Sequence, residues 1–429
     1  MKKFLILILS GTLAQVKGDL PIHCLLEKVI GVWNFKITDG FGFESNQLFD
    51  SKLDHAGVAS EFTLVLRDKS PESHTGILDL SLEAETAQHK FVRTSWTLNY
   101  DEGLVVQQIY PEYTLIFYGP FDYNKVEEFE GKSSSVVLPD GSTPGYASDC
   151  GKVNRGWVIK KSNHSLSTMY FSAIRISDGE SSLSSVDEHT HLDSHLPLEY
   201  HSLMHIPSPA VVFIKQGECG SCFVLAFAHA FEVTFARKTI QKNTLSADSP
   251  FFVDREAILA CSYSSQGCDG GYYQSLILDL LVTGVPQSGC MDKHFEFSSN
   301  TIHTAQQCNP SCFENVVPIA GFSELRTQSR VRSWILMHGP VLAAISLPAR
   351  NQISDQLAQN PDAIIHVENE VHGSWSYVDH GIVLLGWGES AGKFFWEVYN
   401  PWGGELSTMR ISRSINDGII EKYALGIRV

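Results

Sequence analysis

The segment from Gln216 to Phe223 constrains this chain more than any other, because it places a glutamine and two cysteines directly before a long apolar run. Gln216 lies six residues before Cys222, and Cys219 lies three residues before it. The apolar residues that follow recur at helical spacing, which predicts a buried helix that begins at Cys222. A thiol at the N-terminus of a helix meets the positive end of the helix dipole, so we expect Cys222 to ionise readily.

Cys219 and Cys222 alone allow three interpretations: a redox pair, half of a zinc site, or a structural cysteine beside a catalytic one. The downstream sequence favours the third. His380 opens another apolar run, and Asn400 follows it by twenty residues in an Asn-Pro-Trp-Gly motif. A nucleophilic thiol needs a base, and the base needs a group that orients it. Cys222, His380 and Asn400 supply these roles in that chain order.

These residues belong to a longer series of motifs that resembles the papain family of cysteine peptidases. The motifs, in the order of the family, are Gln216, Cys219-Gly220-Ser221-Cys222, Gly267-Cys268-Asp269-Gly270-Gly271, Gly339-Pro340, Asp379-His380 and Asn400-Pro401-Trp402-Gly403. His380 and Asn400 follow Cys222 by 158 and 178 residues. These separations exceed the ~130–150 residues usual in the family, and loop insertions would account for the excess.

The resemblance implies a role for each matching residue. Cys222 is the nucleophile, His380 is the general acid and base, and Asn400 orients the imidazole. The backbone amide of Cys222 and the side-chain amide of Gln216 form the oxyanion hole, which stabilises the negative charge of the transition state.

The resemblance also implies substrate-binding and shielding residues. Trp402 shields the hydrogen bond between the catalytic histidine and asparagine from water. Gly270 and Gly271 let the substrate backbone approach one wall closely, because neither residue has a Cβ. The chain departs from the family at Phe223, where Trp or Tyr is usual, and at Pro401, where Ser is usual.

The chain has nine cysteines, and an odd number leaves at least one thiol unpaired. They are Cys24, Cys150, Cys219, Cys222, Cys261, Cys268, Cys290, Cys308 and Cys312. If Cys222 is the nucleophile, the other eight can form four bridges, whose connectivity the sequence alone does not fix. The family resemblance implies the pairs Cys219–Cys268, Cys261–Cys308 and Cys290–Cys312, which leaves Cys24 for Cys150.

Residues 1–18 have the pattern of a secretory signal peptide, with Lys2 and Lys3 before a short apolar run and small residues after it. Cleavage after Gly18 would make Asp19 the mature N-terminus. The formal charge of −16 becomes −19 when the three lysines of residues 1–18 are removed, which argues against nucleic-acid binding. The chain has no apolar run of the length that spans a membrane, so we expect no membrane anchor.

The length of 429 residues predicts two or three domains. Residues 19–168 contain alternating apolar segments separated by turn signals, which predicts an antiparallel β-barrel or sandwich. Residues 169–195 include a polar, serine-rich stretch and are expected to form an exposed linker or propeptide. Residues 196–429 predict a helical lobe followed by a β-barrel lobe, with the thiol on one and the imidazole on the other. The expected fold class is therefore α+β, a papain-like two-lobed domain preceded by a β-barrel.

The N-terminal third resembles the exclusion domain of the cathepsin C (dipeptidyl peptidase I) branch of the papain family. The matching residues are Asp19-x-Pro21-x-x-Cys24, Gly31-x-Trp33-x-Phe35, Leu98-x-Tyr100-x-x-Gly103 and Cys150 followed by Gly156-Trp157-Val158. Such a domain blocks one end of the substrate groove, so that only two residues fit before the scissile bond. The carboxylate of Asp19 then pairs with the free amino group of the substrate; the alternative is that Asp19 is only a polar residue beside the cleavage site.

The resemblance therefore implies a dipeptidyl aminopeptidase that acts on peptides or proteins with a free N-terminus. It also implies a zymogen cut by an activating protease, a homotetramer, and a lysosomal, vacuolar or secreted location. We expect no metal and no cofactor. Tyrosines bind chloride in that branch, but Gln274 stands at the aligned position. Asn163 begins an N-glycosylation sequon.

Two other functions stay open. One is a papain-like endopeptidase. The other is a catalytically silent binding protein on the same fold, which the altered Asn400–Ser407 segment and Phe223 suggest. A calpain-like cytosolic protease is opposed by the leader and by the number of cysteines.

Overall fold

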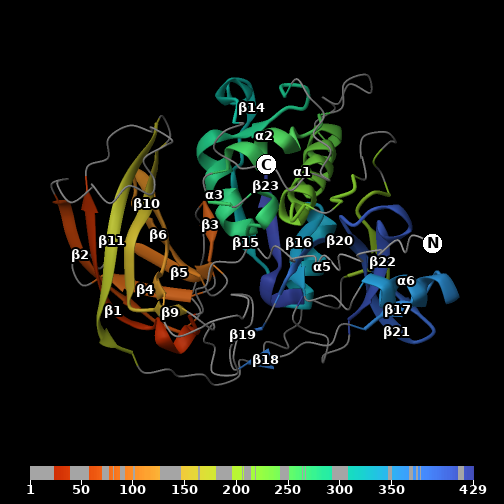
Figure 1. Ribbon diagram of the computed structural model, residues 1–429, viewed down its shortest axis with the longest axis horizontal. Helices are drawn as coiled ribbons and strands as arrows, with labels where there is room; N and C mark the ends of the chain where they lie inside the picture. The colour runs from red at the N-terminus through yellow and green to blue at the C-terminus, as the bar shows by residue number, and fades with distance from the viewer. Residues whose placement is uncertain are drawn as a thin grey trace, which may run out of the picture.

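The structure is a computed structural model, and it shows a β-barrel beside a unit that contains the helices and a large sheet (Figure 1). It describes residues 24–38, 58–69, 77–80, 82–86, 92–99, 102–125, 146–162, 165–179, 196–204, 206, 214–217, 219–241, 251–262, 264–265, 267–291, 308–345, 350–366, 371–372, 375–376, 378–413 and 420–429. The expected signal peptide, Asp19 and Asn163 lie outside the described residues.

The first unit is a closed barrel of eight strands in which neighbours pair antiparallel, as the sequence predicted. In spatial order its strands are β1 (Gly31–Thr38), β11 (Leu166–Asp178), β10 (Lys152–Ser162), β7 (Tyr113–Pro120), β6 (Gly103–Ile109), β5 (Arg93–Asn99), β4 (Leu82–Thr86) and β2 (Val58–Leu66). Alternate residues of β1 are buried, and the rings of Phe35, Phe117 and Phe171 pack together in the core. An eight-stranded barrel is narrow enough for side chains to fill, so aromatic residues stabilise this one from within.

The barrel continues past the boundary that we expected at residue 168, and this expectation needs correction. Position 168 falls inside β11, which pairs with β1 as far as Asp178. The outward residues Ile174 and Ile176 are 48% and 59% exposed, so the segment does not show the usual polar outer face of a strand. Pairing with β1 and β10 therefore determines where this strand ends, and the local sequence pattern does not.

In the described part of the second unit, three α-helices precede most of the strands and two more lie between strands, so the predicted order of a helical part before a β part holds in outline. Its α-helices are α1 (Cys222–Gln241), α2 (Arg255–Cys261), α3 (Tyr273–Thr283), α5 (Gln328–Met337) and α6 (Arg350–Gln359). A nine-stranded sheet runs in the order β17 (Ile364–Ile365), β22 (Thr408–Ser412), β21 (Lys393–Tyr399), β20 (His380–Ser390), β16 (Val341–Ile345), β23 (Leu425–Arg428), β15 (Gly321–Glu324) and β3 (Leu78–Asp79), with β12 (Tyr200–His201) also paired to β20. Two small two-stranded sheets also belong to this part of the chain: β13 (Val285–Pro286) with β14 (Val316–Val317), and β18 (Val371–His372) with β19 (Trp375–Ser376). A third, β8 (Asp122–Lys125) with β9 (Tyr146–Asp149), lies in the N-terminal third.

Helix α1 is buried on nearly every side, which explains why its sequence is apolar all round. It packs in the same core as β20 and α3. Its buried carboxylate, Glu232, accepts a hydrogen bond from the guanidinium of Arg255 at 2.8 Å and another from the Val253 amide. This ion pair fixes α1 against the start of α2.

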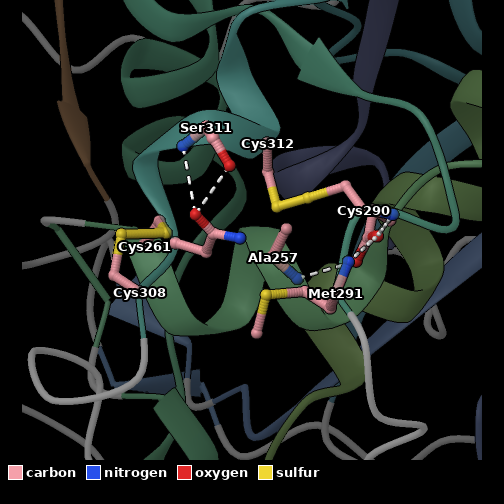
Figure 2. The surroundings of a disulfide bond; sticks show 9 residues. Ala257, Cys261, Cys290, Met291, Cys308, Ser311 and Cys312 are labelled. Atoms are coloured by element: carbon pink, nitrogen blue, oxygen red, sulfur yellow. Dashed lines mark hydrogen bonds between the residues drawn. A yellow bond between two sulfur atoms is a disulfide. The ribbon is translucent and has the colours of Figure 1, made fainter.

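Disulfides staple the segments around α2. Asp254 caps this helix by accepting from the Ala257 amide at 2.9 Å, and its second oxygen accepts from the amides of Cys290 and Met291. Figure 2 shows the Cys261–Cys308 bridge, which starts from the last residue of the helix, and the Cys290–Cys312 bridge near it. The described residues form four disulfides: Cys219–Cys268, Cys261–Cys308 and Cys290–Cys312, which the family resemblance implies, and Cys24–Cys150, the pair that these three left over.

A strand from the N-terminal third joins the barrel to the second unit. Strand β3 lies between β2 and β4 in the chain, yet it pairs in parallel with β15, with Leu78 opposite Phe322. On the barrel side, the Gln107 side chain accepts from the Leu78 amide at 2.7 Å and donates to the Leu78 carbonyl at 2.5 Å. Figure 1 shows β3 between the two units. Backbone pairing therefore attaches the barrel firmly to the large sheet.

The first turn of α3 makes a second contact with the barrel. The Ser275 hydroxyl lies 2.8 Å from both the Asn99 amide nitrogen and the Tyr118 hydroxyl. Tyr272 directly precedes α3, and its hydroxyl donates to the Glu102 carboxylate at 3.0 Å. These barrel residues are buried. The barrel is thus docked where α3 begins, directly after Gly271.

Among the described helices, none combines the length and apolar character needed to cross a bilayer.

Candidate active site

Cys222 is the first residue of α1 and carries a free thiol. The residue is half-buried, and its sulfur accepts a hydrogen bond of 3.4 Å from the backbone amide of Gly381. Gly381 follows His380 at the start of β20. The fold therefore brings the thiol of the first helix against the strand that carries the imidazole, although 158 residues separate them in the chain.

The contacts of Asn400 define which nitrogen of His380 carries the proton. The Asn400 side-chain oxygen lies 2.8 Å from His380 Nε2 and also accepts the backbone N–H of Trp402 at 3.2 Å. A backbone amide can only donate, so the atom shared by these contacts is an acceptor. His380 must therefore donate from Nε2, and Nδ1 keeps a lone pair that can accept a proton.

Trp402 covers this hydrogen bond. Its ring centroid lies 4.9 Å from that of His380 at an interplanar angle of 37°. His380 is 7% exposed and Asn400 is completely buried. A hydrogen bond in such a dry environment is stronger than in water, and the imidazole is held in one orientation.

Burial controls the protonation of the pair. It raises the pKa of the Cys222 thiol to about 11, against the effect of the amide hydrogen bonds, of which that from Gly381 is the strongest. It lowers the pKa of His380 to about 4, and the hydrogen bond with Asn400 raises that pKa only in part. Burial therefore opposes the easier ionisation that we expect from the position of this thiol at the start of a helix. Burial thus disfavours the charged form of each group, and the hydrogen bonds from Gly381 to the sulfur and from His380 to Asn400 oppose this effect when the thiol proton moves to the imidazole.

Gln216 lies beside the segment that follows Asn400. Its backbone amide donates to the Pro401 carbonyl at 2.8 Å. Its side-chain oxygen is buried and has no hydrogen-bond partner among the described residues. Proline at 401 keeps the carbonyl that this contact needs and lacks only the N–H, which explains why the usual serine is not required there.

Gly270 and Gly271 are each required as glycine, but for different structural reasons. Gly270 has a φ of +124°, a backbone conformation that side chains rarely allow. A Cβ at Gly271 would lie 2.7 Å from the Phe223 ring and 2.8 Å from Ser265. Packing of the Phe223 ring therefore requires a glycine at 271, in addition to any role in binding substrate.

No described contact joins the other predicted residues Asp19, Asn163 and Gln274 to this centre. Asp19 and Asn163 lie outside the described residues. Gln274 is buried in α3, and its side-chain oxygen has no partner in the described part of the chain. Within that part, no group of three or more His, Cys, Asp or Glu side chains is placed to bind a metal.

The sequence did not identify three hydrogen bonds that shape the site. The Gly381 amide donates to the Cys222 sulfur, and the Gln216 amide donates to the Pro401 carbonyl. The Tyr273 hydroxyl donates to the Ile382 carbonyl at 3.2 Å. Each joins segments far apart in the chain through a backbone atom. The glycine directly after His380 was the available signal for the first of them.

The family model described as papain family cysteine protease matches residues 209–426, about half of the chain. The chain therefore belongs to the papain family of cysteine proteases. The match includes the free cysteine, the histidine and the asparagine described above, and it begins after the barrel.

The individual relatives described next share less than 30% sequence identity with this chain. A cysteine protease of Blomia tropicalis is 27% identical over 199 residues, which cover 44% of this chain and 53% of that protein. Cathepsin B-like cysteine proteinase 4 of Caenorhabditis elegans is 26% identical over 245 residues, 49% of this chain and 68% of that one. A solved structure of digestive procathepsin L 3 from the Tenebrio molitor larval midgut aligns with a TM-score of 0.43 and 20% identity over 55% of this chain and 71% of its own. The chain spans about half the length of the first curated relatives it matches.

Proposed function

We propose that this protein is a cysteine-type dipeptidyl aminopeptidase, which removes dipeptides from the free N-termini of peptides and proteins. The proposal has two parts. The peptidase chemistry is supported by family membership and by the geometry of Cys222, His380 and Asn400. The restriction to dipeptides is supported by the position of the barrel.

The chemistry begins with proton transfer. Nδ1 of His380 accepts the proton of the Cys222 thiol while the sulfur attacks the carbonyl carbon of the scissile peptide bond. The oxygen that becomes negative is stabilised by the Cys222 backbone N–H and the Gln216 side-chain amide. His380 then gives its proton to the leaving amine, the C–N bond breaks, and a thioester remains on the sulfur. Water, deprotonated by His380, hydrolyses this thioester and restores the thiol.

Docking of the barrel on the first turn of α3 is the observation that supports dipeptide release. Glu102 contacts Tyr272, and Asn99 and Tyr118 contact Ser275. These contacts lie immediately after Gly270–Gly271, the segment proposed to hold the substrate backbone. A barrel at that end would leave room for only a short acyl portion of the substrate. We further propose that Asp19, freed by cleavage after Gly18, pairs with the amino group of that portion.

The remaining expectations are part of the same proposal. Four disulfides suit an oxidising compartment of the secretory pathway, followed by a lysosomal, vacuolar or extracellular location. An activating protease would cut the segment between barrel and catalytic unit. A homotetramer and glycosylation at Asn163 would follow from the likeness to cathepsin C.

The test compares two fluorogenic substrates on the activated protein: a dipeptide amide with a free amino group and the same amide after acetylation. We expect hydrolysis of the first and at least a hundredfold lower kcat/KM for the second, with Cys222→Ala inactive on both. Equal rates would contradict dipeptide release and indicate an endopeptidase. N-terminal sequencing of the activated protein should find Asp19 as an end.

A catalytically silent protein is the second candidate, because Phe223 and the Asn400–Ser407 segment depart from the family pattern and burial disfavours the charged forms of the thiol and the imidazole. Labelling with an epoxide inhibitor of thiol proteases separates the candidates. Activated protein labelled at Cys222 supports the peptidase, and activated protein that resists labelling supports the silent form.

A further inference from the structure

We propose that Tyr273 is a positioning residue that holds the Gly381 amide against the sulfur of Cys222. Tyr273 is the first residue of α3, and its side chain is 1% exposed. Its hydroxyl donates to the Ile382 carbonyl at 3.2 Å, so it joins α3 to the strand β20 that begins at His380. Gly381 directly precedes Ile382 and donates its N–H to the sulfur of the nucleophile, so this contact helps to fix the position of that N–H.

The space beside Gly381 shows how closely Tyr273 packs. A Cβ placed on Gly381 would lie 2.4 Å from the Tyr273 hydroxyl oxygen, 3.0 Å from the ring carbon that bears it, and 3.5 Å from the Cys222 carbonyl carbon. The backbone of residue 381 is thus enclosed by the tyrosine on one side and by the start of α1 on another. Any side chain at 381 would push β20 away from one of them.

The barrel fixes the backbone on either side of Tyr273. Its neighbour Tyr272 bonds to Glu102, and Ser275 bonds to Asn99 and Tyr118. Tyr273 therefore extends from a turn that is anchored on one side, and it contacts the catalytic strand on the other. The barrel supports the geometry of the thiol through this residue, in addition to the role in substrate length proposed above.

The consequence for the thiol follows from its hydrogen bond. The Gly381 amide stabilises the thiolate form of Cys222 and opposes the effect of burial. The titratable groups beside the Gly381 contact are Asp379, whose charge raises the pKa of the thiol, and His380, the first residue of β20. Neither is changed by a substitution at 273. A weaker Gly381 contact would therefore make Cys222 less reactive at neutral pH.

Tyr273→Phe tests the proposal, because it keeps the buried ring and removes only the hydroxyl. The Gly381 N–H contact on the sulfur is itself a hydrogen bond of about 0.5–1.5 kcal/mol, so its loss when the Tyr273 hydroxyl is removed corresponds to a rate lower by about 2- to 13-fold. We expect the iodoacetamide alkylation rate of Cys222 at pH 7 to fall by this factor and its pH midpoint to move upward. In the described structure the other eight cysteines are disulfide-bonded, so the measured rate reports Cys222.

Tyr200→Phe is the matched control, since its hydroxyl accepts from Arg237 at 2.9 Å on β12, outside the site. It removes a hydrogen bond to a charged group, so it should lower the melting temperature at least as much as Tyr273→Phe, without a change in alkylation. A Tyr273→Phe protein with a lowered melting temperature and an unchanged alkylation profile would overturn the proposal, because the hydroxyl would then only stabilise the fold. The assay needs no substrate, so its outcome does not depend on whether the protein is a dipeptidyl peptidase.

Discussion

Replacing Asn400 with alanine should slow peptide hydrolysis by a predictable amount. The lost contact is the 2.8 Å hydrogen bond from His380 Nε2 to a completely buried side chain. A hydrogen bond to a charged group contributes about 1.5–3 kcal/mol and one between neutral groups about 0.5–1.5 kcal/mol. His380 is neutral at rest and becomes an imidazolium when it takes the thiol proton. Asn400 therefore stabilises the transition state over the ground state by about 1–1.5 kcal/mol, which predicts a 5- to 13-fold lower kcat/KM.

The assay is steady-state hydrolysis of a fluorogenic peptide across a range of pH. Because the Asn400 bond raises the pKa of His380 from the low value that burial gives it, Asn400→Ala should also move the acid limb to lower pH. Asn400→Asp keeps the acceptor and adds a negative charge, so it should move that limb upward. The surface variant Asn360→Ala, whose side chain accepts from Asp362 N–H, is the control and should leave the profile unchanged. An Asn400→Ala enzyme with less than a twofold change at every pH would refute the reasoning.

Three further predictions concern the oxyanion, the buried ion pair and pH. Gln216→Ala should lower kcat by about 10²–10³, the usual effect of losing an oxyanion donor; a loss below tenfold in stopped-flow assays would remove Gln216 from that role. Arg255→Met leaves Glu232 buried without its partner, so urea unfolding should show a loss of about 3–5 kcal/mol, part of which Glu232→Leu should restore in the double variant; a loss below 1 kcal/mol would show that the pair is solvated. The wild-type kcat/KM should fall as pH drops through about 4, because a protonated His380 cannot accept the thiol proton; an acid limb near pH 6.5 would contradict its burial.

The sequence was most informative where chemistry requires fixed residue types. Cys222, His380 and Asn400 were recognised from their order and neighbours, and the structure places the sulfur against the strand that carries the histidine. The odd cysteine count correctly left one thiol unpaired. The long apolar run after Cys222 indicated α1, because a helix that is buried on nearly every side is apolar all round.

Contacts between distant segments could not be read from local patterns. The two-residue strand β3 pairs with β15 across more than 240 residues of sequence, and nothing in its own sequence indicates that partner. β11 extends beyond the predicted barrel because its neighbours continue to pair with it. The burial of Cys222 also depends on segments far along the chain, so the sequence could not show that burial opposes the effect of the helix dipole on the thiol.

Mapping a covalent adduct tests the central claim most directly, namely that Cys222 is a nucleophile activated by His380. The activated protein would be treated with a peptide-like epoxide and digested, and the modified residue identified by mass spectrometry. The structure predicts a single adduct at Cys222, formed at a rate that falls at least a hundredfold in His380→Ala. An adduct that forms equally fast without the imidazole, or none on Cys222 at all, would contradict the account.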